Sequence, residues 1–399
     1  MTGTFLLIAG LTLALYPLVV YPFLLVCRVA IQAGGRRESL AYAGGGDEEE
    51  PSLPRISITV PVYNEVHQID DLLGSLVALE YPEDRRQILL VSDGSTDGTD
   101  EAVRAWADRG VELLRVTDRA GKGAAENAAR PHLTGDVVVN TDASIRIRPD
   151  ALPHLIRPFH DPTVGVVSGR DVSVARHGAG SNTGEGGYVG FEMKVRDLET
   201  RAGGIVGASG CFYATRARLH REAVPPELSR DFASVLVARD HGYRAVSAPE
   251  AVCFVPRTGS LKREYRRKVR TVARGMSTLW AWRRLLNPLR HPVFAWKLFS
   301  HKICRWTFPF ALALVLAGLA LLAPGHVWAL GALAAAGLVG VLAVVGWILS
   351  REGKSLPAVL SVPAFVLMSN VAVVHALGRA VAGGSERLWE PTRRASVAE

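Results

Sequence analysis

The sequence predicts an α/β domain with a mainly parallel sheet, held at a membrane by apolar helices on both sides. Short apolar runs alternate with helical stretches from residue 55 onward, and long apolar runs lie near both ends of the 399-residue chain. No comparable run occurs between Arg28 and Arg305. Because strands that alternate with helices form parallel sheets covered on both faces, the middle of the chain is predicted to be a soluble domain.

The apolar run 5–27 carries no charge. It is long enough to cross a hydrocarbon core of about 30 Å at about 1.5 Å per helical residue. It lacks a basic n-region and no A-x-A site follows it, so we interpret it as a retained anchor and not as a cleaved signal peptide. Three further runs, at 306–323, 327–349 and 356–378, predict about three C-terminal transmembrane helices. The predicted organisation begins with an N-terminal anchor (1–32), a linker (33–54) and a central domain (55–257). Amphipathic interfacial helices (258–304), a transmembrane region (305–382) and a tail (383–399) follow.

Charge and cysteine usage indicate the compartment. Arg28, Arg36 and Arg37 follow the first apolar run, so the positive-inside rule places the central domain in the cytosol of a multi-pass inner-membrane protein. The four cysteines show no C-x-x-C pairing, which suits a reducing compartment and argues against a zinc site. The net charge of +8 concentrates beside the apolar runs, which favours membrane lipids or phosphates over nucleic acid as partners.

Motifs occur where the predicted strands end. Ligands bind beyond the carboxyl ends of the strands of a parallel sheet, so this placement indicates a site. The expected strands are 56–60, 87–91, 111–116, 136–139 and 164–167, with helices between them such as 68–79 and 99–108. The motifs are Pro61-Val62-Tyr63-Asn64-Glu65, Asp93-Gly94-Ser95-Thr96-Asp97-Gly98-Thr99, Gly121-Lys122-Gly123, Thr141-Asp142-Ala143-Ser144, Gly207-Ala208-Ser209-Gly210 and Arg230-Asp231-Phe232.

In this order and at these intervals, the motifs resemble the catalytic domain of family-2 glycosyltransferases. The resemblance covers roughly residues 55–275 and is closest to membrane-embedded members that build polysaccharides, such as the cellulose and hyaluronan synthases. It implies a GT-A (Rossmann-like) fold and an inverting transfer of a sugar from a nucleotide-diphosphate sugar. The expected donor is a UDP-sugar.

The resemblance assigns a donor half to the first three motifs. Pro61, Tyr63 and Glu65 would hold the base and ribose, Asp93 would bind the base, and Lys122 would approach the nucleotide. The alternatives are structural: a strand-to-helix turn with Asn64 as N-cap, a tight turn after Asp93, and a solvated lysine.

Asp142 matches the first residue of the family's Asp-x-Asp element, which binds a divalent cation across the two phosphates. Oxygen ligands suit Mg²⁺ or Mn²⁺, and such a metal neutralises charge on the leaving diphosphate. Here Ser144 replaces the second aspartate, so it would be a weaker ligand to the metal or to a water on it.

The acceptor half is assigned to the last two motifs. Gly207 and Ser209 match a loop where small residues let a sugar approach the backbone, although helix packing through small residues is an alternative. Asp231 matches the general base of an acidic dipeptide whose first member is Arg230 here. Its structural alternative is an N-cap for a helix over 232–240.

A basic amphipathic helix is predicted over 262–279, with arginines recurring on one face and an apolar stripe of Tyr265, Val269, Val272 and Met276. Such a helix lies in a membrane interface. Processive relatives carry Gln-x-x-Arg-Trp here, whereas this chain reads Arg267-Lys268-Val269-Arg270-Thr271. Arg267 and Arg270 could still contact the diphosphate, but the acceptor should be held loosely.

The sequence therefore predicts sugar transfer from a nucleotide donor to a glycan acceptor at the cytosolic membrane face, for polysaccharide synthesis. Two alternatives remain. Transfer of a single sugar to a lipid carrier is favoured by the missing Gln-x-x-Arg-Trp residues. A non-catalytic membrane scaffold is favoured by Ser144 and Arg230.

Overall fold

The computed structural model describes residues 1–39, 53–174, 183–256, 261–350 and 356–382. The chain forms two compact units, each described by itself. A sheet unit is made from the described parts of Gln32–Arg176 and Val189–Arg257. A helical unit is made from those of Met1–Ile31, His177–Tyr188 and Thr258–Gly384.

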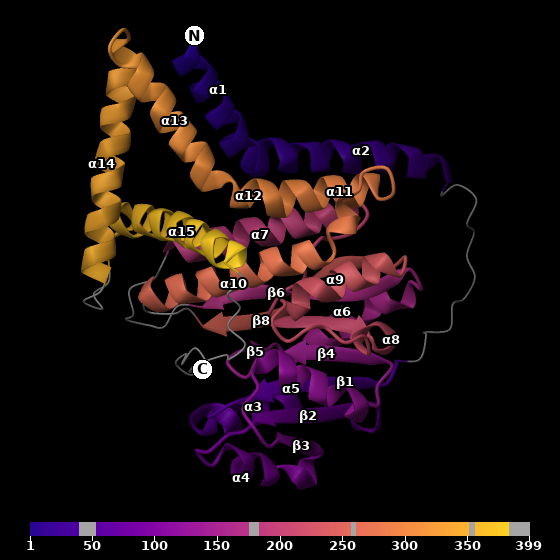
Figure 1. Ribbon diagram of the computed structural model, residues 1–399. Helices are drawn as coiled ribbons and strands as arrows, with labels where there is room; N and C mark the ends of the chain where they lie inside the picture. The colour runs from indigo at the N-terminus through magenta and orange to yellow at the C-terminus, as the bar shows by residue number, and fades with distance from the viewer. Residues whose placement is uncertain (40–52, 175–182, 257–260, 351–355, 383–399) are drawn as a thin grey trace. The chain divides into compact units, whose positions relative to one another are not determined.

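Within the described residues the sheet has eight strands in the order β3-β2-β1-β4-β7-β6-β8-β5 (Figure 1). The strands are β1 Ile56–Val62, β2 Arg86–Asp93, β3 Val111–Val116, β4 Val137–Thr141, β5 Arg146–Ile147, β6 Val164–Val174, β7 Phe212–Arg216 and β8 Arg244–Pro256. The pairs β1–β2, β2–β3, β1–β4 and β6–β8 are parallel. β7 runs antiparallel between β4 and β6, and β5 runs antiparallel to β8. The five predicted strands are present. The sheet is mixed because β7 and the short β5, which the sequence pattern did not reveal, run in the opposite direction.

The two faces of the sheet differ in chemistry. On one face, alternate residues of β1 (Ile56, Ile58, Val60 and Val62) join the main hydrophobic core. This core includes residues of α3 (Ile69–Val77) and α6 (Ala151–Ile156). The other face has a smaller core in which Leu89, Val91 and Val138 pack with Ala125 and Ala129 of α5 (Lys122–Ala129). Burial on both faces explains why the middle of β2, residues 88–91, is a continuous apolar run.

The remaining helices of this part of the chain differ in extent from their sequence patterns. They are α4 Thr99–Arg104, α7 Thr183–Arg201, α8 Ala217–His220 and α9 Arg230–Asp240. The predicted helix over 99–108 ends at Arg104 and is followed by a 3₁₀ turn, Ala107–Arg109, which closes on Gly110 in the left-handed region.

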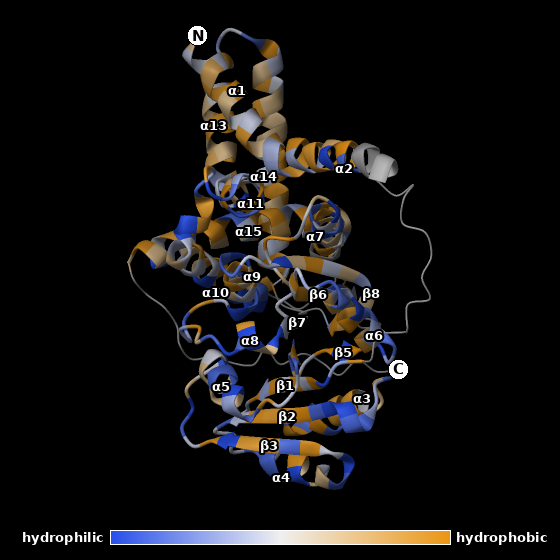
Figure 2. Cartoon of the chain, turned by 90° about the vertical axis from the view of Figure 1, so that its right-hand side faces the viewer, coloured by the Kyte–Doolittle hydropathy of each residue, from blue (hydrophilic) through white to orange (hydrophobic). Residues whose placement is uncertain are grey.

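The helical unit contains the predicted apolar segments. Its helices are α1 Thr2–Leu15, α2 Tyr21–Ser39, α10 Leu261–Ala281, α11 Pro292–Leu298, α12 Cys304–Trp306, α13 Phe308–Leu322, α14 Val327–Leu349 and α15 Ala358–Val381. By length and composition, three described helices could cross a membrane: Thr2–Gln32, Val327–Leu349 and Ala358–Val381. The predicted span at 306–323 differs, because α13 joins Pro292–Trp306 at a bend of 58°, so the pair has the form of a broken span or of a re-entrant loop. Figure 2 shows hydrophobic residues along α1 and α13.

α10 has the predicted extent, but protein covers its apolar stripe. Val269 and Ala273 are buried against Ala372 and Ala376 of α15. The Tyr265 hydroxyl lies 2.8 Å from His375 Nδ1, also on α15. Much of this stripe therefore packs against another helix of the same unit.

Small residues bring α1 and α13 into close contact. A Cβ on Gly10 would lie 2.7 Å from the backbone nitrogen of Val315, and one on Gly318 would lie 2.6 Å from that of Leu7. Such distances leave no room for a side chain. Close backbone approach through small residues is a common way for helices to associate in lipid.

We therefore expect Gly318→Leu to lower the midpoint of thermal unfolding in detergent, because an inserted side chain must push the helices apart at a cost of about 1–3 kcal/mol. Gly340→Leu on α14 is the matched control, since a Cβ there meets nothing within 4 Å. Equal midpoints for the two variants would contradict this packing.

Candidate active site

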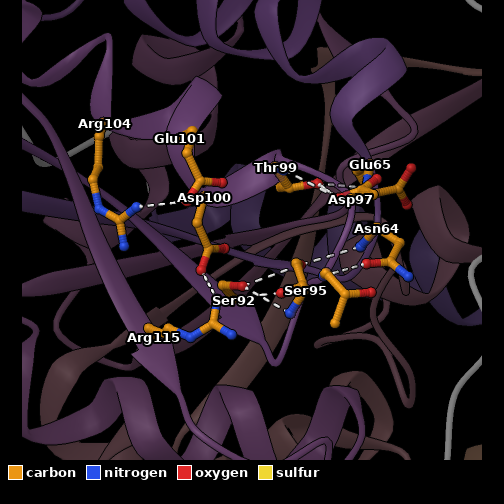
Figure 3. Close-up of polar contacts among 11 residues, drawn as sticks. Asn64, Glu65, Ser92, Ser95, Asp97, Thr99, Asp100, Glu101, Arg104 and Arg115 are labelled. Carbon is orange, nitrogen blue, oxygen red and sulfur yellow. Dashed lines mark hydrogen bonds and ion pairs between the residues drawn. The ribbon is translucent and has the colours of Figure 1, made fainter.

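The first two motifs are joined by hydrogen bonds at the ends of β1 and β2 (Figure 3). Asn64, in the left-handed region at φ 53, donates from its backbone to Ser95 Oγ at 3.2 Å. Its Oδ1 accepts from the backbone of Thr96 at 2.8 Å. The Glu65 backbone donates to Thr99 Oγ1 at 2.9 Å. Asn64 therefore fixes one loop against the other, and its expected alternative role as a helix N-cap is wrong.

Asp97 completes this connection. Its Oδ2 accepts from the backbone of Val66 at 3.2 Å, and its Oδ1 accepts from the Thr99 backbone at 3.1 Å. Burial raises the pKa of Asp97, but the hydrogen bonds from Thr99 and Val66 outweigh burial and lower it overall. The carboxylate form therefore holds the two loops together.

Asp93 lies at the end of β2 and is 1% exposed. Its two carboxylate oxygens accept from the backbones of Ala120 and Gly121, each at 2.8 Å. This carboxylate therefore fixes the loop that leads into α5. In the same loop, the Arg119 guanidinium lies 3.9 Å from the centre of the Tyr63 ring, a stacking contact that the sequence did not reveal.

Pro61 and Glu65, which are also predicted to bind the nucleotide sugar, have defined positions in the structure. Pro61 lies in β1, where it pairs with Val91 of β2. Glu65 is 7% exposed, and its carboxylate accepts from the side chain of Gln68. The assigned contacts of these residues with base and ribose stay predictions.

Lys122 is the first residue of α5, directly after Gly121 at φ 91. Its ammonium lies 2.5 Å from Asp142 Oδ1 and 3.7 Å from Glu126 Oε1. Burial lowers the pKa of Lys122, but Asp142 and Glu126 outweigh burial and raise it overall. The lysine is thus a fixed, charged partner of Asp142, and the alternative of a solvated lysine is wrong.

A metal at this place would have few ligands from the chain. Asp142 follows β4, and Ser144 lies two residues further on without a charge. In the described part of the chain, no group of three or more His, Cys, Asp or Glu side chains is arranged to hold a metal. Mg²⁺ commonly binds through one or two carboxylates together with substrate phosphates and waters. Asp142 fits a metal of that kind, shared with a diphosphate.

The pairing of β7 with β4 brings the predicted acceptor loop, 207–210, close to Asp142. Phe212 pairs with Thr141, the residue before Asp142. Gly210, two residues earlier, would direct a Cβ to within 3.5 Å of Asp231 Oδ2. The segment 210–212 therefore connects the surroundings of Asp142 with those of Asp231.

Ser209 shapes this loop from inside. It is fully buried, its hydroxyl donates to Asp171 Oδ1 at 2.5 Å, and its backbone donates to Ser168 Oγ at 2.8 Å. Gly207 is buried beside it. The segment is a loop between α7 and β7, so the alternative of helix packing through small residues is wrong.

Asp231 lies in the first turn of α9, whose N-cap is Ser229. The Asp231 carboxylate is half-buried and accepts from the Ser229 hydroxyl at 2.8 Å. The capping alternative for Asp231 is therefore wrong, since the helix begins at Arg230, two residues earlier than predicted.

Arg230, which replaces an acidic residue of the family pattern, is buried, with 7% of its surface exposed. Its guanidinium donates to Asn127 Oδ1 at 2.7 Å and to the His220 carbonyl at 3.3 Å, joining α9 to α5 and α8. Burial and the charge of Arg230 hold the pKa of His220 well below its ordinary value, so this imidazole is neutral. Arg230 is thus part of the scaffold.

Tyr213 was not predicted as a site residue. It is 2% exposed, and its hydroxyl has no hydrogen-bond partner among the described residues. Burial raises its pKa, and Glu126 and Asp231 raise it further while Arg230 and Lys122 oppose them. Tyr213 therefore lies within electrostatic reach of both Lys122 and Asp231. No sequence signal marked this residue, because its position depends on the pairing of β7.

Arg267 and Arg270 lie on α10, in the helical unit. The Arg267 guanidinium donates to both carboxylate oxygens of Glu264, at 2.8 and 2.9 Å. Their contact with a diphosphate stays a prediction.

Residues 57–221 match the family model described as Glycosyl transferase family 2. The chain contains a family 2 glycosyltransferase domain. The chain is 25% identical over 236 residues to poly-beta-1,6-N-acetyl-D-glucosamine synthase of Staphylococcus aureus, covering 57% of this chain and 56% of that protein. It is 34% identical over 108 residues to undecaprenyl-phosphate 4-deoxy-4-formamido-L-arabinose transferase of Sodalis glossinidius, covering 26% of this chain and 33% of that protein. The matches thus span about half or less of these relatives.

Among solved structures, the chain resembles the mannosyltransferase PcManGT from Pyrobaculum calidifontis in complex with GDP-Man and Mn²⁺. The TM-score is 0.71 at 23% identity, over 96% of this chain and 100% of that chain. This likeness confirms the predicted GT-A fold of the family 2 domain.

We expect Arg230→Ala to destabilise the family 2 domain by about 2 kcal/mol, because it removes charged hydrogen bonds and leaves buried partners unsatisfied. Thermal unfolding of the full-length protein in detergent would measure this. Arg104→Ala is the matched control: its side chain is 55% exposed in an ion pair with Glu101, so a shift within about 0.5 kcal/mol is expected. A large loss for Arg104→Ala, or none for Arg230→Ala, would remove Arg230 from the scaffold.

Proposed function

We propose that the protein is an inverting glycosyltransferase that moves a sugar from a nucleotide-diphosphate sugar to a glycan acceptor at the cytosolic membrane face, for polysaccharide synthesis. The observation that carries this proposal is the convergence of two kinds of group on the segment 210–212. Lys122 and Asp142, a cation and a carboxylate suited to a diphosphate, form an ion pair next to Thr141, which pairs with Phe212. The half-buried carboxylate of Asp231 lies beside Gly210.

The chemistry follows from these two groups. Asp231 accepts the proton of an acceptor hydroxyl, whose oxygen forms a bond to the anomeric carbon of the donor sugar. The bond between that carbon and the diphosphate oxygen breaks on the opposite face, so the configuration inverts. Lys122 and Asp142 lie where the departing diphosphate and its divalent ion would be held, and such an ion, Mg²⁺ or Mn²⁺, neutralises the charge that develops there.

The comparisons support the donor class. The structure of PcManGT contains GDP-Man and Mn²⁺, and the two relatives are named for a polysaccharide product and for transfer involving undecaprenyl phosphate. UDP remains the nucleotide that the resemblance favours. The arginines after the first apolar segment support a cytosolic catalytic domain in a multi-pass inner-membrane protein.

A second candidate is transfer of one sugar to a lipid carrier. Its support lies in α10, where the family's Gln-x-x-Arg-Trp residues are replaced. Arg267 is held by Glu264, and Val269 is buried against α15. Thr271 stands where the motif has its tryptophan, so this position lacks the aromatic side chain that would stack on a glycan between successive transfers.

Sizing of the product tests both candidates. Full-length protein in detergent would be incubated with radiolabelled UDP- and GDP-sugars in parallel, with glycan or polyprenyl-phosphate acceptors. Short or singly extended products at early times are expected. High-molecular-mass polymer formed while most acceptor is unused would contradict loose holding of the acceptor, and failure of every donor to be transferred or hydrolysed would leave only the non-catalytic scaffold.

For Asp231→Asn we expect kcat to fall at least about 10²-fold, because the amide cannot accept a proton at neutral pH. Nucleotide affinity, measured by calorimetry, should hardly change. Ser229→Ala is the control, since it removes a neighbour of the carboxylate but keeps the base, and it should alter kcat far less. Near-normal turnover of Asp231→Asn would exclude Asp231 as the base.

Asp142→Ala should abolish transfer while the protein remains folded, and EDTA should abolish the activity of the unmodified protein until Mg²⁺ or Mn²⁺ is restored. Both follow if Asp142 is the principal protein ligand of the divalent ion. Thermal midpoints recorded beside turnover separate lost chemistry from unfolding. Full activity in the presence of chelator would rule out the metal role.

A further inference from the structure

The feature of the site that the proposed function does not yet explain is the ion pair between the Lys122 ammonium and Asp142. The Lys122 ammonium lies 2.5 Å from Asp142 Oδ1, and the two side chains are only 22% and 23% exposed. The Glu126 carboxylate, 5% exposed and 3.7 Å from the ammonium, adds a second negative partner. Partial exclusion of water makes this ion pair stronger than one on an open surface.

A free divalent ion would therefore meet two obstacles. It would have to displace or lie beside a positive charge, which opposes binding at this distance. It would also find one carboxylate and the neutral Ser144, in a described chain that offers no group of three or more His, Cys, Asp or Glu ligands. Mg²⁺ and Mn²⁺ favour several oxygen ligands, so most of them must come from elsewhere.

A nucleotide diphosphate removes both obstacles at once. Its oxygens complete the coordination of the ion, and its charge gives the ammonium a new anionic partner. Lys122 is well placed for this exchange because it opens α5, and the N-terminal end of a helix favours a phosphate. The α5 N-terminus is also packed tightly, since a Cβ on Gly123 would lie 2.6 Å from the carbonyl oxygen of Pro226.

We propose that Lys122 is an internal counterion of Asp142, so that the site does not take a free divalent cation and instead takes the complex of the metal with a nucleoside diphosphate. This inference rests on the proposed function, because it assumes a diphosphate donor. Metal binding then depends on the nucleotide. Lys122 neutralises Asp142 when no nucleotide is bound and contacts the diphosphate when it is.

Equilibrium dialysis of full-length protein in detergent against ⁵⁴Mn²⁺ tests the proposal without any turnover. The unmodified protein should retain little Mn²⁺ alone and clearly more when UDP or GDP is added. Lys122→Met should bind Mn²⁺ without nucleotide at least about tenfold more tightly than the unmodified protein, since Asp142 is then free of its ammonium. Lys122→Arg keeps a cation and should behave like the unmodified protein.

Lys194→Met is the matched control, because Lys194 is an exposed lysine of the same sheet unit and its loss should change nothing. Lys122→Gln serves the same purpose as Lys122→Met should the latter fail to fold. The proposal is overturned if the unmodified protein binds Mn²⁺ as tightly without nucleotide as Lys122→Met does, or if Lys122→Met gains no affinity.

Sugar transfer distinguishes failure of this inference from failure of the proposed function. Normal transfer together with tight nucleotide-free Mn²⁺ binding would overturn the counterion role alone. A protein that binds neither UDP nor GDP, with or without Mn²⁺, would overturn the proposed function and this inference with it.

Discussion

The antiparallel entry of β7 between β4 and β6 is the constraint on which the site depends. The residues after β4 and the loop before β7 are far apart in the sequence, and the pairing of β4 with β7 brings them together. Pairing of Phe212 with Thr141 places the acceptor loop beside Asp142, and Gly210 then faces Asp231. One pair of neighbouring strands thus joins a region suited to a diphosphate to a carboxylate suited to proton transfer.

Hydrogen bonds keep these loops in place. Asp93 holds the backbone before α5, Asp97 and Asn64 join the first two loops, and Ser209 fixes the acceptor loop from within. Asp93 and Ser209 are buried, and buried polar groups are costly unless they are satisfied, so these bonds limit the alternative conformations of the loops. Several motif residues therefore act on the backbone first, and the charged groups Lys122, Asp142 and Asp231 remain for chemistry.

The two departures from the family pattern have different physical consequences. Arg230 stands where an acidic residue is usual, and it is absorbed into a buried network with Asn127 and the carbonyl of His220. Ser144 leaves Asp142 as the single charged side chain of this motif, and Lys122 forms an ion pair with it. Neither departure removes the carboxylate on which the proposed chemistry depends.

The sequence by itself determined the class of the fold, the apolar segments at both ends and the location of the site at the strand ends. These follow from local patterns: alternation of strands with helices, runs of apolar residues, and turn residues at the ends of strands. It could not show β7, the contact of Lys122 with Asp142, the stacking of Arg119 on Tyr63 or the position of Tyr213. These features join residues that are 20 or more positions apart, or depend on such a pairing, and no local pattern encodes which strand lies beside which. Only the packed sheet decides that, because the register of β4 with β7 sets which side chains face one another.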